Sequence, residues 1–168
     1  MKLDFIQVGR IVNAHGIRGE VRLLPRGFDP AYLTGFDTFY IGRDKTPVRP
    51  QANHVHKSFV LLKLPGVDDM NAALAYKEQP VFIRRADAGE DAVFDDELIG
   101  MDVKNADTGE TLGRVTLVED YPASKVYTVT GEKTYLIPAV PEVFIRSVDL
   151  EANVMEVHIL KGMASDEN

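Results

Sequence analysis

The stretch of sequence that decides the fold spans residues 8–22. It reads Val8-Gly9-Arg10-Ile11-Val12-Asn13-Ala14-His15-Gly16-Ile17-Arg18-Gly19-Glu20-Val21-Arg22. Apolar and β-branched residues stand on both sides of two glycines three positions apart, which predicts two strands joined by a tight turn. Similar runs recur through the chain between Gly and Pro residues. We therefore expect a mostly β protein.

The first half predicts a small barrel of about six strands and one short helix. The predicted strands cover residues 5–12, 20–24, 38–41, 53–56, 58–64 and 81–84. The helix begins after Asp68 and Asp69, whose side chains can cap it, and Pro80 prevents its continuation. Val67, Met70 and Leu74, together with Ala73, fall on one side at helical spacing, which predicts a buried helix face.

Residues 86–97 break this pattern, because they hold six acids and no strand alternation. We expect a solvated, extended linker here. The predicted organisation is two small β-barrel domains joined by this acidic linker. Its parts are an N-terminal barrel over 1–88, the linker over 89–97, a second barrel over 98–162 and a flexible tail over 163–168.

The composition excludes several classes of protein. The 168 residues include no cysteine, which excludes disulfides, zinc–cysteine sites and thiol catalysis. No apolar run approaches the length of a membrane span, and the first residues lack a signal peptide. We expect a cytoplasmic protein with no membrane partner.

The formal charge of −7 is unevenly distributed. Residues 1–88 hold 13 Lys and Arg against 9 Asp and Glu, a charge of +4, whereas residues 89–168 hold 6 against 17, a charge of −11. A basic half suits phosphate and an acidic half suits a basic protein. The alternative is that the acidic surface merely aids solubility.

The sequence contains no nucleotide-binding glycine loop and no serine-hydrolase motif. His54 and His56 lie two apart, so they share one face of a strand and could begin a metal site. A third ligand is not evident, and a solvated strand face is the alternative. We expect no catalytic residue, no cofactor and no metal, although a metal-dependent hydrolase that uses these two histidines is a third possibility.

The corner in residues 13–20 groups donors suited to phosphate or base edges, from Asn13, His15 and Arg18. Arg22 follows on the same strand face as Arg18, and Arg10 precedes the turn. Guanidinium groups bind phosphate oxygens in pairs and stack on bases, so these arginines form a candidate phosphate track. A plain hairpin turn and a solvated strand face are the alternatives.

The acidic half carries four aromatic residues that we expect at the surface among carboxylates. The rings would supply contact area and the carboxylates would attract a basic protein. The four residues are Phe94, Tyr121, Tyr127 and Tyr135. The alternative is that these rings belong to the core or rim of a barrel.

Residues 8–22 closely resemble the opening of the bacterial ribosome maturation factor RimM family. The second half resembles that family's PRC-barrel domain. It does so at residues 98–100, 112–115, 135–141 and 148–150, and in their order. The likeness covers residues 5 to about 162.

The resemblance implies a non-enzymatic factor that binds the immature 30S subunit and 16S rRNA and assists head assembly and rRNA processing. It implies that the PRC barrel binds ribosomal protein uS19 and that the factor is a monomer. The candidate rRNA contacts are Arg10, Asn13, His15, Arg18 and Arg22. A generic PRC-barrel adaptor unconnected with the ribosome is the alternative.

One position departs from the family. Members usually carry an aromatic pair, implicated in ribosome binding, shortly before the residue 98–100 motif. Here the corresponding residues are Val93 and Phe94, so only one ring remains. The resemblance assigns the protein-partner contact to these two residues and predicts weaker binding there, or reliance on other contacts.

Overall fold

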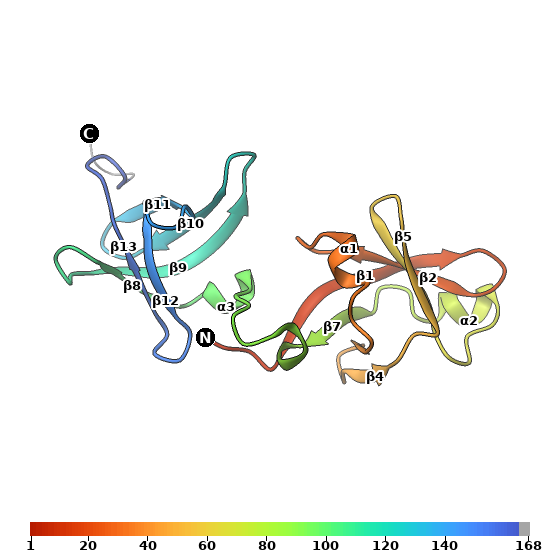
Figure 1. The fold of residues 1–168 in the computed structure, drawn as a ribbon. Helices are drawn as coiled ribbons and strands as arrows, with labels where there is room; N and C mark the ends of the chain where they lie inside the picture. Colours follow the sequence, from red (N-terminus) through yellow and green to blue (C-terminus); the bar gives the residue numbers. More distant parts are fainter. Residues whose placement is uncertain (165–168) are drawn as a thin grey trace. The chain divides into compact units, whose positions relative to one another are not determined.

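The computed structural model describes residues 1–164, which form two compact units (Figure 1). The N-terminal unit is Asp4–Ala92. The C-terminal unit starts at Val93 and also includes Met1–Leu3. Both units are built around β-sheets with a few short helices, so the predicted mostly β, two-barrel fold is confirmed.

The N-terminal unit is a seven-stranded antiparallel sheet that curves into a half-barrel, with strand order β4-β3-β7-β1-β2-β6-β5. Its elements are β1 (Phe5–His15), β2 (Glu20–Pro25), α1 (Pro30–Leu33), β3 (Phe39–Ile41), β4 (Thr46–Val48), β5 (Ala52–His56), β6 (Phe59–Lys63), α2 (Met70–Leu74), β7 (Pro80–Arg84) and the 3-10 helix η1 (Arg85–Ala88). The sequence analysis missed β4 and α1. The latter is four residues long, with Asp29 as its cap and Pro30 in its first turn.

Strand β1 decides which side chains face outward in this unit. Two irregularities interrupt its pairing, one between Gln7 and Gly9 against β7 and one between Ile11 and Asn13 against β2. Each bulge shifts the inward and outward alternation by one residue. Ile6, Val8 and Ile11 are therefore all buried in the core, although their spacing is not uniform.

Helix α2 begins where predicted, because the Asp69 carboxylate accepts a hydrogen bond from the amide of Ala72 at 2.8 Å. The predicted buried face is confirmed only in part, because Val67 is buried but two of the other three residues are not. Ala73 is the buried residue of this helix, whereas Met70 and Leu74 are exposed. With five residues the helix completes little more than one turn, so one small side chain suffices to seat it on the sheet.

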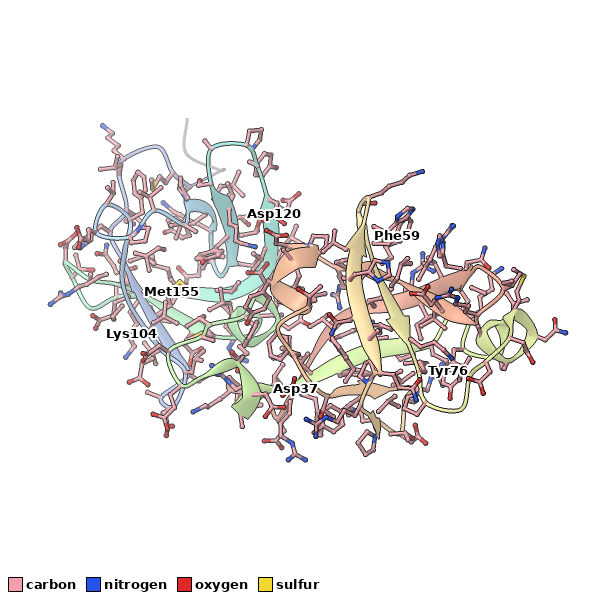
Figure 2. All side chains as sticks on the ribbon, turned by 45° about the vertical axis from the view of Figure 1, so that its right-hand side comes forward. Asp37, Phe59, Tyr76, Lys104, Asp120 and Met155 are labelled. Atoms are coloured by element: carbon pink, nitrogen blue, oxygen red, sulfur yellow. The ribbon has the colours of Figure 1, made fainter. Side chains whose placement is uncertain are left out.

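The C-terminal unit is a six-stranded sheet with strand order β11-β10-β9-β8-β13-β12, in which β8 and β13 run parallel. Its elements are α3 (Asp95–Leu98), β8 (Asp102–Asn105), β9 (Thr111–Asp120), β10 (Lys125–Thr130), β11 (Thr134–Pro138), β12 (Ile145–Asp149) and β13 (Val154–Val157). Met101, Val129 and Met155 lie in its core, and Figure 2 labels Met155 within the sheet.

The expected linker is shorter than predicted, because only residues 89–94 of it lie outside helices and strands. Residues 85–88 form η1, and residues 95–98 form α3. The Glu97 carboxylate is fully buried, where it accepts hydrogen bonds from the amides of Phe94 and Leu3. Three of the six acids that suggested a solvated linker therefore start a helix of the C-terminal unit.

The end of the described chain is also better ordered than expected. Ala164 is buried and forms an antiparallel bridge with Tyr135 of β11. The rest of the predicted tail, residues 165–168, lies outside the described residues. Within residues 1–164, no helix is long and apolar enough to cross a membrane.

Candidate nucleic-acid and protein interfaces

The β1–β2 corner is built as the sequence predicts. His15 pairs with Glu20, and residues 16–19 form the turn between the two strands. Both turn glycines have positive φ. A Cβ on Gly16 would meet nothing within 4 Å, whereas one on Gly19 would lie 2.6 Å from the carbonyl oxygen of Asp69. The backbone that approaches Gly19 thus belongs to the start of α2, beside the turn (Figure 1), not to another molecule.

Arg22 is held in a fixed position on the outer face of the sheet. Its Nε and Nη2 atoms lie 3.3 and 3.0 Å from Nδ1 of His15, and its guanidinium carbon lies 5.7 Å from the ring centroid of Phe59. Because arginine only donates, Nδ1 must accept, which leaves the proton of neutral His15 on Nε2. Three N–H donors of the Arg22 guanidinium do not contact His15. Figure 2 shows Phe59 on the β5–β6 hairpin.

Asn13 and Arg18 are the accessible members of the corner. Asn13 faces Arg22 across the strand pair, on the outer side of the sheet, and is exposed. Arg18 lies in the turn, not in the strand as predicted, and is exposed. In residues 1–164 it forms no ion pair or hydrogen bond with another side chain, so its guanidinium is available to a ligand.

Arg10 differs from the other predicted contacts, because it already has an anionic partner. Its Nη1 atom lies 2.8 Å from Oε2 of Glu78, and both side chains are exposed. A phosphate at Arg10 would compete with this carboxylate. Sequence reasoning missed Glu78, which lies 68 residues away in the chain and carries no recognisable motif.

The structure brings three histidines together on the outer face, near Glu20. The rings of His15 and His56 have centroids 5.1 Å apart, and Nδ1 of His54 lies 3.9 Å from Oε2 of Glu20. Within the described chain, no group of three or more His, Asp or Glu side chains has a geometry that could hold a metal ion. These histidines therefore belong to the polar surface that also holds Arg22.

The predicted partner residues of the C-terminal unit have opposite exposures. The Phe94 side chain is only 7% exposed, whereas Val93 is 49% exposed. The expectation that Phe94 presents the remaining ring at the surface is wrong, because this residue is buried at the N-cap position of α3. At this position, Val93 is the side chain that a partner can reach.

Lys125 connects the start of α3 to the end of β9. Its Nζ atom lies 2.6 Å from Oδ2 of Asp95 and 3.0 Å from Oδ1 of Asp120, which Figure 2 labels. Burial lowers the pKa of Lys125, but the hydrogen bonds and charges of the two carboxylates outweigh it and raise the pKa above 10.5. Burial and the charge of Asp95 raise the pKa of Tyr127 above 10.0, against a smaller lowering by Lys125.

Of the four aromatics expected at the surface of the acidic half, Tyr121 is the exposed one. Its side chain is 53% exposed, just after β9, whereas Tyr127 is buried and Tyr135 is half-buried. Because Lys125 holds Asp120 and Asp95 together, the exposed residues next to them, Tyr121 and Val93, belong to one region of the unit. We call Val93, Asp95, Asp120 and Tyr121 the acidic-apolar region.

The charge contrast is smaller between the structural units than between the sequence halves. Glu90 and Asp91 belong to the N-terminal unit, and Lys2 belongs to the C-terminal unit. The N-terminal unit therefore has 12 basic against 11 acidic residues, and the C-terminal unit has 7 against 15. The C-terminal unit remains strongly acidic, whereas the N-terminal unit is nearly neutral and its positive charge is local.

A polar cavity of about 340 Å³ lies in the N-terminal unit, away from the corner. Its lining includes Asp37, Arg49 and Asp87, and Figure 2 labels Asp37. The lining contains no histidine or lysine that could serve as a general base beside Thr38.

Comparison with known proteins identifies both units. Residues 6–88 match the model of the RimM N-terminal domain, and residues 95–163 match that of the RimM PRC barrel domain. The ribosome maturation factor RimM of Acetivibrio thermocellus is 37% identical, covering 98% of this chain and 99% of its own length. That of Clostridioides difficile is 32% identical over 96% of this chain and 97% of its own.

A crystal structure of a RimM protein from Pseudomonas aeruginosa is also similar. It is 23% identical, with a TM-score of 0.47, covering 93% of this chain and 98% of that one. The two family models together cover both halves of the sequence, and each of the two curated relatives spans nearly the whole chain. The chain belongs to the RimM family of ribosome maturation factors.

Proposed function

We propose that this protein is a non-catalytic maturation factor that binds the immature 30S subunit in the cytoplasm and assists head assembly and 16S rRNA processing. The observation that carries the proposal is the full-length match of both units to ribosome maturation factors. A match over both units supports a shared action of the whole chain, not of one domain alone.

The β1–β2 corner is the proposed rRNA contact. Arg18 and Arg22 present guanidinium groups to solvent, and Asn13 and His15 add neutral donors beside them. Arg22 is already held by His15 and Phe59, so little side-chain entropy is lost when it binds a phosphate. Arg10 is the fifth proposed contact and must exchange Glu78 for the phosphate.

The acidic-apolar region of the C-terminal unit is the proposed contact for ribosomal protein uS19, a basic protein. Val93 and Tyr121 offer exposed apolar area, and the surrounding carboxylates attract positive charge. Phe94 supports this contact indirectly, because its buried amide donates a hydrogen bond to Glu97 at the start of α3. The tyrosine at 121 supplies a ring that position 93 lacks.

Co-sedimentation of the full chain with ribosomal particles tests this function. The protein should sediment with immature 30S particles and remain in the supernatant with mature 30S and 50S subunits. If it ignores all three particles, the maturation role is excluded. If the protein binds none of these particles but binds a protein complex that lacks uS19, it is an adaptor that does not act on the ribosome.

A further inference from the structure

A second cluster lies on the outer face of the N-terminal sheet, near the start of β1 and far from the corner. We call Phe5, Tyr40, Lys45, Phe82 and Arg84 the aromatic-cation face. Because strand residues alternate in direction, pairing partners share a face. Phe5 pairs with Arg84, and Tyr40 pairs with Phe82, so β1, β7 and β3 present these side chains on one side.

Within this face, two cations lie over three rings. Nζ of Lys45 lies 4.8 Å from the ring centroid of Phe82 and 5.7 Å from that of Phe5. The guanidinium carbon of Arg84 lies 5.4 Å from the centroid of Tyr40 and 5.9 Å from that of Phe5. Phe5 and Tyr40 also meet edge to face, with centroids 5.0 Å apart. Each distance falls within the range of cation–π attraction.

The two cations of this face have no carboxylate partner among residues 1–164, in contrast to Arg10, Lys63 and Lys125. Arg84 is exposed, Phe5, Lys45 and Phe82 are half-buried, and Tyr40 is buried, so Arg84 is the member most open to a ligand. A solvated sheet face usually balances its cations with acids on neighbouring strands. Here the neighbours are rings, and the charge of both cations remains available to an anion.

We propose that the aromatic-cation face binds unpaired nucleotides of an RNA by stacking a base and neutralising its phosphates. A planar base can stack on the guanidinium plane of Arg84, which the rings support from the other side, while Lys45 contacts the backbone phosphates. An acidic peptide would use the charges but not the planar surface. The proposal rests on the proposed function, which supplies RNA as the partner, and adds single-stranded nucleotides as the recognised form.

The face would form a contact separate from the corner. Phe5 begins β1 and His15 ends it, and eleven residues of strand span roughly 30 Å at about 3.3 Å per residue. Arg10 lies between them on the same strand. The outer side of β1 would therefore contact RNA at both ends, with base stacking at the first and phosphate contacts at the second.

The test measures binding of the full chain to a fluorescein-labelled RNA of ten uridines and to a decamer of the same sugar–phosphate chain without bases. The wild-type protein should bind the uridine decamer about 5- to 100-fold more tightly than the abasic one. Phe5→Leu with Phe82→Leu, which keeps apolar volume and removes both rings, should abolish most of that preference. Equal affinity of the wild type for the two decamers would overturn the proposal.

A second set of variants keeps the test valid if the ring variant unfolds. Arg84→Gln changes an exposed side chain, and should weaken binding of both decamers and flatten the salt dependence. Lys77→Gln, an exposed cation after α2 with no ring beneath it, is the matched control and should bind like the wild type. If Arg84→Gln behaves like Lys77→Gln, the face does not bind RNA.

The two proposals can fail independently. If Arg18→Ala with Arg22→Ala abolishes decamer binding and Arg84→Gln does not, the corner assignment stands and the aromatic-cation face is overturned. If the decamers bind through the face but immature 30S particles are ignored, the stacking proposal stands and the maturation role fails.

Discussion

At the scale of single residues, the side chains of the corner differ in how accessible they are to a ligand. Asn13, His15 and Arg22 do lie on one face. Arg10, however, is paired with Glu78, and Phe94 is buried. Neither outcome could be read from local spacing, because Glu78 comes from a distant segment and the burial of Phe94 depends on the cap of α3.

Removing Arg18 or Arg22 should weaken RNA binding more than removing Arg10. If three phosphates are neutralised, affinity for 16S rRNA falls about 40-fold between 50 and 200 mM salt. Arg18→Ala and Arg22→Ala should each reduce the slope of log affinity against log salt by about one. Arg10→Ala should change it less, because Arg10 must first leave Glu78. Unchanged slopes in both Arg18→Ala and Arg22→Ala would contradict the phosphate contacts.

Glu78→Gln is the complementary variant, because it releases Arg10 without removing a cation. Affinity for 16S rRNA at low salt should rise and the salt slope should steepen. The same change in an Arg10→Ala background should have a smaller effect, which separates the release of Arg10 from the general loss of a negative charge.

The Lys125 network predicts a loss of stability at alkaline pH. Both Lys125 and Tyr127 have pKa values raised in the folded state, so their contributions are full below about pH 10 and are lost as pH rises further. Tyr127→Phe should flatten the decline in unfolding free energy above pH 10, by a slope of at most about 1.4 kcal/mol per pH unit, the limit for one proton. Urea unfolding followed by circular dichroism at pH 8 to 12 measures this, and a decline as steep as that of the wild type would contradict it.

At the scale of elements, the strands were predictable because β-branched runs alternate with Gly and Pro turns. The bulges in β1 were not, and they place Arg10 and Asn13 on one face although three positions separate them. Residues 95–97 were misassigned for a related reason. Their acids suggested solvent, but acids also favour the first turn of a helix, where Glu97 caps α3 from a buried position.

The contact between the corner and α2 predicts different costs at the two turn glycines. Gly16→Ala should destabilise the protein by about 1 to 2 kcal/mol through its positive φ alone. Gly19→Ala adds a Cβ against the backbone of Asp69 and should cost about 1 to 3 kcal/mol more. Chemical denaturation of the two variants measures the difference in their unfolding free energies. Equal losses would contradict the prediction, because they would mean that the start of α2 moves to accommodate the Cβ at position 19.

At the scale of the whole molecule, the proposed function assigns RNA to the N-terminal barrel and a protein partner to the C-terminal barrel. The two-domain order was evident from the sequence, but the boundary was not, because Met1–Leu3 join the C-terminal unit. Moving the boundary reduces the N-terminal charge to 12 basic against 11 acidic residues. The proposed RNA contact therefore relies on the local positions of the arginines, because the net charge of the unit is close to zero.

The acidic-apolar region should bind uS19 independently of RNA. Val93→Glu with Tyr121→Ala should weaken binding of the full chain to purified uS19 by at least tenfold, because two exposed apolar anchors are lost. Affinity for 16S rRNA should stay unchanged. Leu160→Glu, an exposed apolar residue outside this region, is the control, and titration calorimetry gives both affinities. An equal effect of the control would deny the region any special role.

The most direct test is co-sedimentation of immature 30S particles with the wild type, Arg18→Ala/Arg22→Ala, Val93→Glu/Tyr121→Ala and the combination of all four changes. If the two units bind different components, each pair of changes weakens binding and the free-energy losses of the two pairs add in the combination. A wild-type protein that remains in the supernatant, or variants that all bind like the wild type, would contradict the division of binding between the two barrels.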